Sequence, residues 1–271
     1  MKLLTRANTK TIKGKRRGFS TNILHLAPAK LSGYEVCGGR SEQCTIYCLN
    51  KAGRGRFDRT QEARIRKTKW FFESRLTFMA QLVKDVVAAI RYANRNNLVV
   101  AIRLNGTSDI PWELIKCGAF KNIMARFPNV QFYDYTKVAG RKNIPSNYHL
   151  TFSASESNQS QVTQAIANGM NVAVVFDQIP DSYMGLPVID GDEDDLRFLD
   201  PKGHIVGLKA KGPAVKSSST FIVRNSNASR SIRDFGQQPL QRFDHSNSIQ
   251  HSRQSGSKHQ GLDVQRTQEH A

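Results

Sequence analysis

The stretch LVVAIRLNGTSD, residues 98–109, joins an apolar run to a polar turn. An apolar run of this length is typical of a β-strand that is buried on both faces. Similar runs recur along the chain, at residues 21–28 (TNILHLAP), 130–135 (VQFYDY), 148–155 (YHLTFSAS) and 171–176 (NVAVVF). We therefore predict a sheet of buried strands, of which residues 98–104 form one.

Segments with helical patterns lie between these runs. Apolar residues recur at steps of three and four within residues 58–94, which predicts a long helix with a break near residues 71–72. Residues 111–127 and 157–167 suit shorter helices. Alternation of buried strands with helices favours parallel βα units with right-handed crossovers. The predicted fold class is α/β, a partial or irregular βα barrel with mostly parallel strands.

The pattern changes after residue 189. Residues 195–199 (DLRFL) and 205–210 (IVGLKA) are joined by the turn signal DPKG, which predicts a C-terminal hairpin. The preceding DGDEDD, residues 190–195, lacks the glycine position and the twelfth ligand of a calcium loop, since residue 201 is Pro. We expect a solvated acidic turn there.

Composition divides the chain into a folded part and a tail. After about residue 224 the sequence turns to Ser, Gln, Asn, His and Arg with single apolar residues. Such a segment buries too little apolar area to offset its ordering entropy. We predict an α/β domain over residues 1–224 and a disordered tail over residues 225–271.

The composition also bounds the environment of the protein. Four Cys in 271 residues are too few for a disulfide scaffold, and residues 1–18 lack the apolar segment of a secretory signal. No apolar run approaches the roughly 20 residues that span a bilayer. We therefore expect a protein of a reducing compartment, outside the membrane.

Positive charge is concentrated at the beginning of the chain. The formal net charge is +18, and residues 1–69 hold 17 Lys and Arg against 4 Asp and Glu, a balance of +13. A basic region of this kind attracts polyanions, of which nucleic acid is the commonest in a cytoplasm. The N-terminal quarter therefore predicts a nucleic-acid partner, with a plain solvated surface as the alternative.

Three of the four cysteines stand close together in residues 34–56, YEVCGGRSEQCTIYCLNKAGRGR. Cys37, Cys44 and Cys48 follow the first predicted strand directly, and three thiolates suit an iron–sulfur cluster or an incomplete zinc site. The C-x6-C-x3-C spacing lacks the C-x2-C pair of zinc ribbons, although His25 or Cys117 could supply a fourth ligand. Three free thiols buried in a core remain the structural alternative.

Polar residues follow each predicted strand. Because reactive groups gather beyond the carboxyl ends of parallel strands, this series predicts one site at that edge. An alternative for Ser108 or Asp109 is to cap a helix that begins near Pro111. Besides the three cysteines, the candidates are Asn105, Gly106, Thr107, Ser108 and Asp109 after the second strand, Asp134 and Lys137 after the third, Ser153, Ser155 and Glu156 after the fourth, and Asp177 after the fifth.

Several of these motifs together resemble a known family. The segments LAPAKLSGYEVCGGRSEQCTIYCLNKAGRGR, RLNGTSDIPWE, FYDYTK, NYHLTFSASE and VIDGDEDDLRFLDPKGHIVGLKAKG are similar to the bacteriophage gene product 88 family, over about residues 2–223. The resemblance implies a phage source and expression in the host cytoplasm, and it carries no mechanism.

The order of the polar segments resembles the layout of radical S-adenosylmethionine enzymes. In that layout three thiolates after the first strand hold a [4Fe–4S] cluster whose open iron binds the cofactor. The resemblance implies that Cys37, Cys44 and Cys48 bind the cluster, that residues 105–109 face the amino group of S-adenosylmethionine, and that Ser153, Ser155 or Glu156 meets its ribose. The cysteine spacing departs from the usual C-x3-C-x2-C.

Two other functions remain open from the sequence. The first is a base-modifying enzyme similar to the guanine transglycosylases, for which Asp109, Asp134 and Asp177 are candidate bases or nucleophiles. Together with Lys137 they are the candidate catalytic residues. The second is a non-catalytic nucleic-acid-binding protein with a structural zinc ion.

Overall fold

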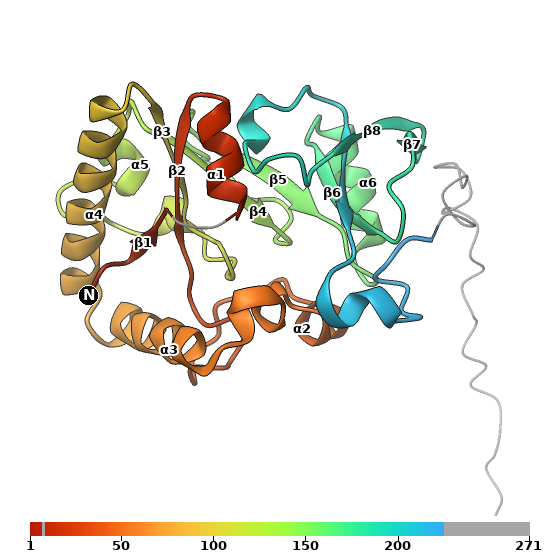
Figure 1. The fold of residues 1–271 in the computed structure, drawn as a ribbon, viewed down its shortest axis with the longest axis horizontal. Helices are drawn as coiled ribbons and strands as arrows, with labels where there is room; N and C mark the ends of the chain where they lie inside the picture. Colours follow the sequence, from red (N-terminus) through yellow and green to blue (C-terminus); the bar gives the residue numbers. More distant parts are fainter. Residues whose placement is uncertain (7–8, 225–271) are drawn as a thin grey trace, which may run out of the picture. The chain divides into compact units, whose positions relative to one another are not determined.

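The structure, a computed structural model, describes residues 1–6 and 9–224, and they contain one sheet of nine strands (Figure 1). The strand order is β1-β2-β3-β4-β5-β6-β9-β8-β7. Strands β2 to β6, β9 and β8 run parallel, while β1 and β7 pair antiparallel at the two edges. The strands are β1 (Leu4–Thr5), β2 (Phe19–Leu24), β3 (Val99–Arg103), β4 (Gln131–Thr136), β5 (Tyr148–Ser153), β6 (Val172–Phe176), β7 (Ser182–Tyr183), β8 (Leu186–Asp190) and β9 (Ile205–Lys209).

The predicted α/β class with mostly parallel strands is confirmed. Each of the five apolar runs predicted as a strand overlaps one of β2 to β6, and each of these pairs in parallel with the next. The described sheet ends in two edge strands and does not close, so the predicted barrel is not confirmed. The predicted tail, residues 225–271, lies outside the described residues.

The predicted hairpin at residues 195–210 is wrong. Arg197–Leu199 form a 3-10 turn, η4, and β9 pairs in parallel with both β6 and β8. The segment turns inward because Asp195 and Arg197 are buried in ion pairs. The antiparallel hairpin is instead β7–β8, whose turn residues Met184 and Gly185 both have positive φ, as the favoured two-residue turn requires.

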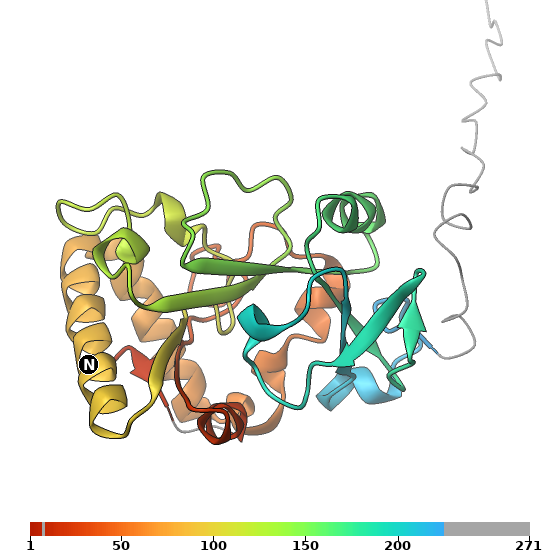
Figure 2. The ribbon, with the colours of Figure 1, turned by 90° about the horizontal axis from the view of Figure 1, so that it is seen from above.

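Helices cover the sheet from both sides. The long helix predicted over residues 58–94 is present as α3 (Asp58–Glu73) and α4 (Arg75–Arg95), which meet at Ser74. Phe78, Leu82 and Val86 of α4 join the core on β2 to β4. Figure 2 shows α6 (Gln159–Ala167) and α1 on opposite sides of the strands. The remaining helices are α1 (Thr9–Arg16), α2 (Glu42–Ile46) and α5 (Ile123–Arg126), with 3-10 turns at Leu49–Lys51 (η1), Gly53–Arg56 (η2), Trp112–Leu114 (η3) and Gly212–Lys216 (η5).

The sheet face opposite α4 and α6 is polar and holds buried ion pairs. Arg103 on β3 bonds Asp195 at 3.0 Å, and Asp194 bonds Arg17 at 2.6 Å and Arg197 at 3.2 Å. Asp194 and Asp195 are only 5% and 1% exposed, so the expectation of a solvated acidic turn is wrong for these two residues, whereas Asp190 and Glu193 are exposed. Their carboxylates neutralise arginines inside the fold.

No helix within residues 1–6 and 9–224 has both the length and the apolar character to cross a bilayer. The sequence led to the same expectation.

One buried carboxylate ties the first strand to α4. Asp85 Oδ2 accepts the backbone N–H groups of Leu3, at 2.5 Å, and Leu4, at 3.0 Å, while Lys67 Nζ donates to the Leu3 carbonyl at 2.8 Å. We predict that Asp85→Ala lowers the free energy of unfolding by about 1–3 kcal/mol for each amide left without an acceptor. Urea unfolding measures this, and Lys84→Ala, an exposed neighbour, is the control. Equal stability of the two variants would contradict the assignment.

Candidate functional site

The three clustered cysteines line one pocket. Cys37 lies in the long connection after β2, Cys44 lies in α2, and Cys48 precedes η1. All three are free and half-buried. The pocket, of about 340 Å³, is also lined by residues at the carboxyl ends of β3, β4 and β5, among them Asp109, Lys137 and Ser153. The sequence prediction of one site at that edge agrees with this arrangement.

A carboxylate from the next part of the sheet fixes the cysteine segment. The Ser41 hydroxyl accepts the Cys44 N–H at 3.1 Å and so caps α2. Glu156, after β5, accepts the Ser41 hydroxyl at 2.8 Å and the Gln43 N–H at 3.1 Å. Acidic groups at a helix N-terminus are stabilising. Glu156 therefore positions Cys44 from outside the pocket and is not among the residues that line it.

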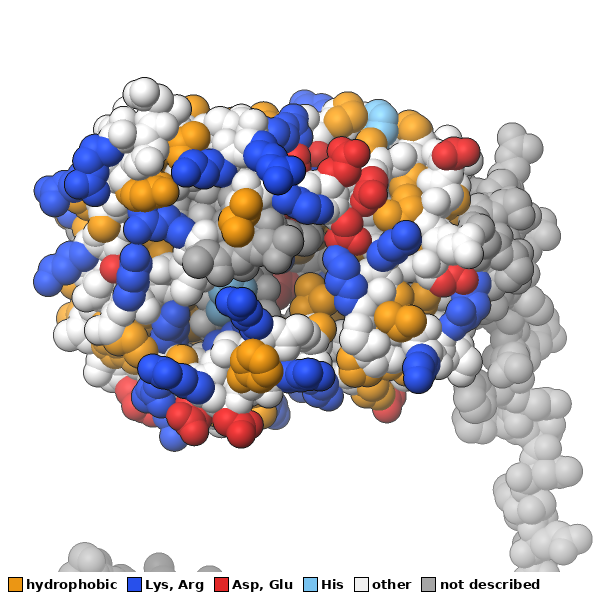
Figure 3. All heavy atoms as spheres, in the orientation of Figure 1, with side chains coloured by type: hydrophobic (Ala, Val, Ile, Leu, Met, Phe, Trp, Pro, Cys, Tyr) orange, Lys and Arg blue, Asp and Glu red, His pale blue; other side chains and the backbone are white. Residues whose placement is uncertain are grey.

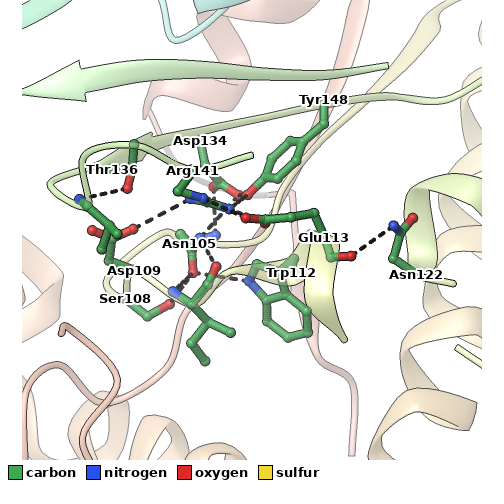
Figure 4. Close-up of polar contacts among 12 residues, drawn as sticks. Asn105, Ser108, Asp109, Trp112, Glu113, Asn122, Asp134, Thr136, Arg141 and Tyr148 are labelled. Atoms are coloured by element: carbon green, nitrogen blue, oxygen red, sulfur yellow. Dashed lines mark hydrogen bonds and ion pairs between the residues drawn. The ribbon is translucent and has the colours of Figure 1, made fainter. Parts of the chain in front are cut away.

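Asn105 organises the turn after β3 (Figure 4). Its side-chain oxygen accepts hydrogen bonds from the Ser108 hydroxyl at 2.8 Å, the Ile110 N–H at 3.0 Å and the Trp112 indole N–H at 3.0 Å. Its backbone N–H donates to Asp134 at 2.7 Å. The side-chain oxygen of Asn105 is therefore engaged in hydrogen bonds that shape the turn. Residues 105–109 of this turn line the pocket.

Asp109 joins three segments at the edge of the pocket. Its carboxylate accepts the Lys137 N–H at 2.7 Å and faces Arg141 at 3.7 Å. Its own N–H donates to the Val36 carbonyl at 2.7 Å, next to Cys37. Burial raises the pKa of Asp109. The cysteine segment is thus bonded to the turn after β3, and the turn to the end of β4.

A buried ammonium group stands beside the thiols. Lys137 Nζ donates to Ser153 Oγ at 2.6 Å, the Ser153 carbonyl at 3.3 Å and the Ala154 carbonyl at 3.0 Å. Burial lowers the pKa of Lys137, and the negative charges possible at Cys44 and Asp109 oppose that shift. Because Ser153 Oγ accepts a hydrogen bond from Lys137, the proton of the Ser153 hydroxyl remains available for a hydrogen bond to a ligand.

Burial keeps the thiols in their neutral form. It raises the pKa of Cys37 to about 12, and it raises the pKa of Cys44 and of Cys48 as well. A negative charge on Cys44 or Cys48 would raise the pKa of Cys37 further. A metal cation bound by the sulfurs would favour the thiolate form instead of the thiol, because coordination deprotonates a thiol.

Four predicted site residues lie apart from the pocket lining. Asp134 is fully buried between β3 and β5, where it accepts the Asn105 N–H and, at 2.8 Å, the Tyr148 hydroxyl. Asp177 faces Arg224 at 3.7 Å, and neither it nor Ser155 or Glu156 lines the pocket. The structure brings together the other ten, which are Cys37, Cys44, Cys48, Asn105, Gly106, Thr107, Ser108, Asp109, Lys137 and Ser153.

Sequence reasoning missed several residues that line the pocket. The Arg103 guanidinium lies 4.7 Å from the centre of the Tyr135 ring, and the buried Tyr135 hydroxyl has no hydrogen-bond partner among the described residues. Lys209, the last residue of β9, and Phe221, which follows it in the chain, also line the pocket. Period-two alternation along β3 and β4 could have indicated Arg103 and Tyr135, because they point away from the apolar core.

Residues 1–6 and 9–224 contain no group of three or more His, Cys, Asp or Glu side chains arranged to hold a metal ion. The thiols share a pocket without converging on one ion.

The fold and the site define an α/β protein with an open, mostly parallel sheet and a pocket of free thiols at the carboxyl edge of its strands. The chain belongs to the bacteriophage Gene product 88 family, whose family model matches residues 2–225. This confirms the family resemblance seen in the sequence motifs. A search among curated proteins and a search among solved structures each gave no match.

Neighbouring glycines allow a test of how the cysteine segment is held. A Cβ on Gly39 would lie 2.9 Å from the backbone carbonyl of Lys137, whereas a Cβ on Gly38 would meet no atom within 4 Å. We predict that Gly39→Ala lowers the free energy of unfolding by about 1–3 kcal/mol. Gly38→Ala should be neutral or slightly stabilising, because it restricts only the unfolded chain. Urea unfolding of both variants distinguishes the outcomes, and a stable Gly39→Ala protein would rule out this contact.

Asp134 should give the protein a characteristic pH dependence. Burial raises the pKa of Asp134 from 3.8 to about 7, so the folded protein keeps a proton that the unfolded chain loses near pH 4. This stabilisation is complete below pH 4 and is lost as the pH rises to about 7. We predict that the stability of the wild type relative to Asp134→Asn falls by up to about 1.4 kcal/mol per pH unit over this range. Denaturant unfolding from pH 4 to 8 measures it, and a constant difference would refute the shift.

Proposed function

We propose that the pocket is a metal-dependent active site in which Cys37, Cys44 and Cys48 hold a [4Fe–4S] cluster and which acts, with S-adenosylmethionine, on a nucleotide or nucleic acid. The observation that carries the proposal is that three free thiols from one segment line a single pocket with the carboxyl ends of β3, β4 and β5. The consecutive order of β2 to β6, followed by β9, suits a partial βα barrel with the pocket at its mouth.

The donor set fits an iron–sulfur cluster better than a single zinc ion. A structural zinc ion takes four protein ligands, and the pocket offers three thiols. Three ligands also leave one iron open for the cofactor.

When bound, a cluster with an open iron supplies one-electron chemistry and a place for an amino-carboxylate group. The chain's own residues would do the rest. The Lys137 ammonium lies where it offsets the negative charge of the thiolates. The hydroxyls of Ser153 and Tyr135 can donate hydrogen bonds to a ligand, since neither donates to another described residue. We place the reaction in the host cytoplasm, which keeps thiols reduced.

The transglycosylase alternative has less support. That chemistry needs a nucleophile and a base in one pocket, and of the three candidate aspartates only Asp109 lines this one. Asp134 is enclosed behind the turn, and Asp177 pairs with Arg224.

The four cysteines provide a matched experiment. Cys117 is buried in the core away from the pocket and serves as the control. We predict that protein purified without oxygen is brown and contains iron and acid-labile sulfide, that Cys37→Ala, Cys44→Ala and Cys48→Ala each lose most of both, and that Cys117→Ala keeps them. Metal analysis, sulfide determination and visible absorption give the result, and urea unfolding checks that each variant folds.

Two outcomes would overturn the cluster. Colourless anaerobic protein with one zinc ion per chain would indicate a structural metal in a non-catalytic protein. Iron that stays bound in all three pocket variants would show that these thiols are not its ligands.

A further inference from the structure

Exposed basic side chains lie on two segments, residues 49–57 and 209–217, each of which contributes residues to the pocket lining. These segments are in contact, because a Cβ on Gly212 would lie 3.1 Å from the Ala52 side chain, and the Ser217 hydroxyl donates to the hydroxyl of Tyr47. Leu49, Lys209 and Lys211 line the pocket itself. We call the exposed Lys and Arg side chains of these two segments the basic rim, namely Lys51, Arg54, Arg56, Lys209, Lys211 and Lys216.

Most of the rim charge is not neutralised locally. Lys211 pairs with Asp192, and Lys51 Nζ donates to the Ile46 carbonyl at 3.3 Å. The other four members of the rim have no ion pair with any described residue, whereas the buried Arg103, Arg141 and Arg197 are all paired. Unpaired positive charges around an opening attract and orient anions.

Apolar side chains stand among these charges. Leu49, Phe57 and Val215 are 56%, 53% and 60% exposed, and Phe57 directly follows Arg56. Figure 3 shows Lys, Arg and hydrophobic side chains side by side on the lower part of its face, where Figure 1 places α2, α3 and residues 212–216. An exposed aromatic ring within a basic surface is the combination on which unpaired bases stack.

The pocket limits what form of nucleic acid can reach the site. A volume of about 340 Å³ lies at the lower end of the range for small-ligand sites, so a base-paired duplex cannot enter it. Enzymes that act on a base inside such a pocket take it unstacked and unpaired. We propose that the basic rim binds the phosphates of a single-stranded nucleic acid and that Phe57 stacks on a base, so that one unpaired nucleotide faces the pocket. The inference rests on the proposed function, for which it names a single-stranded nucleic acid as the substrate. Binding of that strand to the basic rim does not require the cluster.

The test compares two triple variants that lose the same charge. The rim variant is Arg54→Ser, Arg56→Ser and Lys216→Ser, and the control is Lys84→Ser, Arg91→Ser and Arg95→Ser on the exposed side of α4. Binding of a fluorescein-labelled 20-nucleotide single-stranded DNA is followed by anisotropy at several salt concentrations. We expect the rim variant to bind about 100-fold more weakly near 0.1 M salt, with a salt slope smaller by about 2, and the control to change less than threefold.

A second pair of variants tests stacking. Phe57→Ala should weaken binding by about 5-fold or more without changing the salt slope, whereas Leu76→Ala, which removes another exposed apolar side chain, should not. Equal losses in the rim and α4 variants would overturn the proposal in favour of general attraction by net charge. Tighter binding of the matching duplex would overturn the single-stranded form.

The two proposals can fail separately. Protein stripped of its metal by an iron chelator should still bind the single strand with the affinity of the untreated protein. If the protein holds a cluster but the rim variant binds DNA as the wild type does, the inference about the rim is wrong and the cluster proposal stands.

Discussion

The site depends on the buried hydrogen bonds between Asn105 and Asp134. Asp134 lies inside β4, two residues before its carboxyl end, and accepts the Asn105 N–H at 2.7 Å, which fixes the turn after β3. This turn also positions Asp109. The Asp109 N–H donates to the Val36 carbonyl, and the Asp109 carboxylate accepts the Lys137 N–H. Hydrogen bonds therefore link the strand ends to the cysteine segment, and an uncompensated loss within a buried network of this kind is costly.

Charge on the polar face of the sheet is balanced in pairs. Arg103 and Arg197 are 13% and 2% exposed in their side chains, and each bonds a carboxylate of residues 194–195. Removing one partner of a buried pair leaves a charge that nothing compensates. The carboxylates of Asp194 and Asp195 therefore stabilise the fold by pairing with buried arginines, and this accounts for the acidic residues at these two positions. On this face the Tyr135 hydroxyl and Arg103 Nε, both of residues that line the pocket, have no hydrogen-bond partner among the described residues.

The sequence predicted what depends on local patterns and missed what depends on tertiary contacts. Apolar runs located β2 to β6, and polar residues after them located the edge where the pocket lies. Asp134 was grouped with the reactive residues because it ends a strand, yet strand alternation places it on the same side as Phe132, within the core. No local signal indicates that Glu156 caps α2, since its partners lie 113 and 115 residues away.

Proton balance links the thiols to the basic surroundings of the pocket. With the pKa of Cys37 raised to about 12 by burial, the metal-free site is neutral at its sulfurs, and Lys137 and the basic rim leave its surroundings positive. Metal binding would release the thiol protons and place thiolate charge beside Lys137. Because screening weakens charge interactions beyond about 10 Å, that change acts mainly inside the pocket. If both proposals hold, the rim residues outside the pocket would attract phosphates whether or not a metal is bound, and polynucleotide binding and metal binding would be separable.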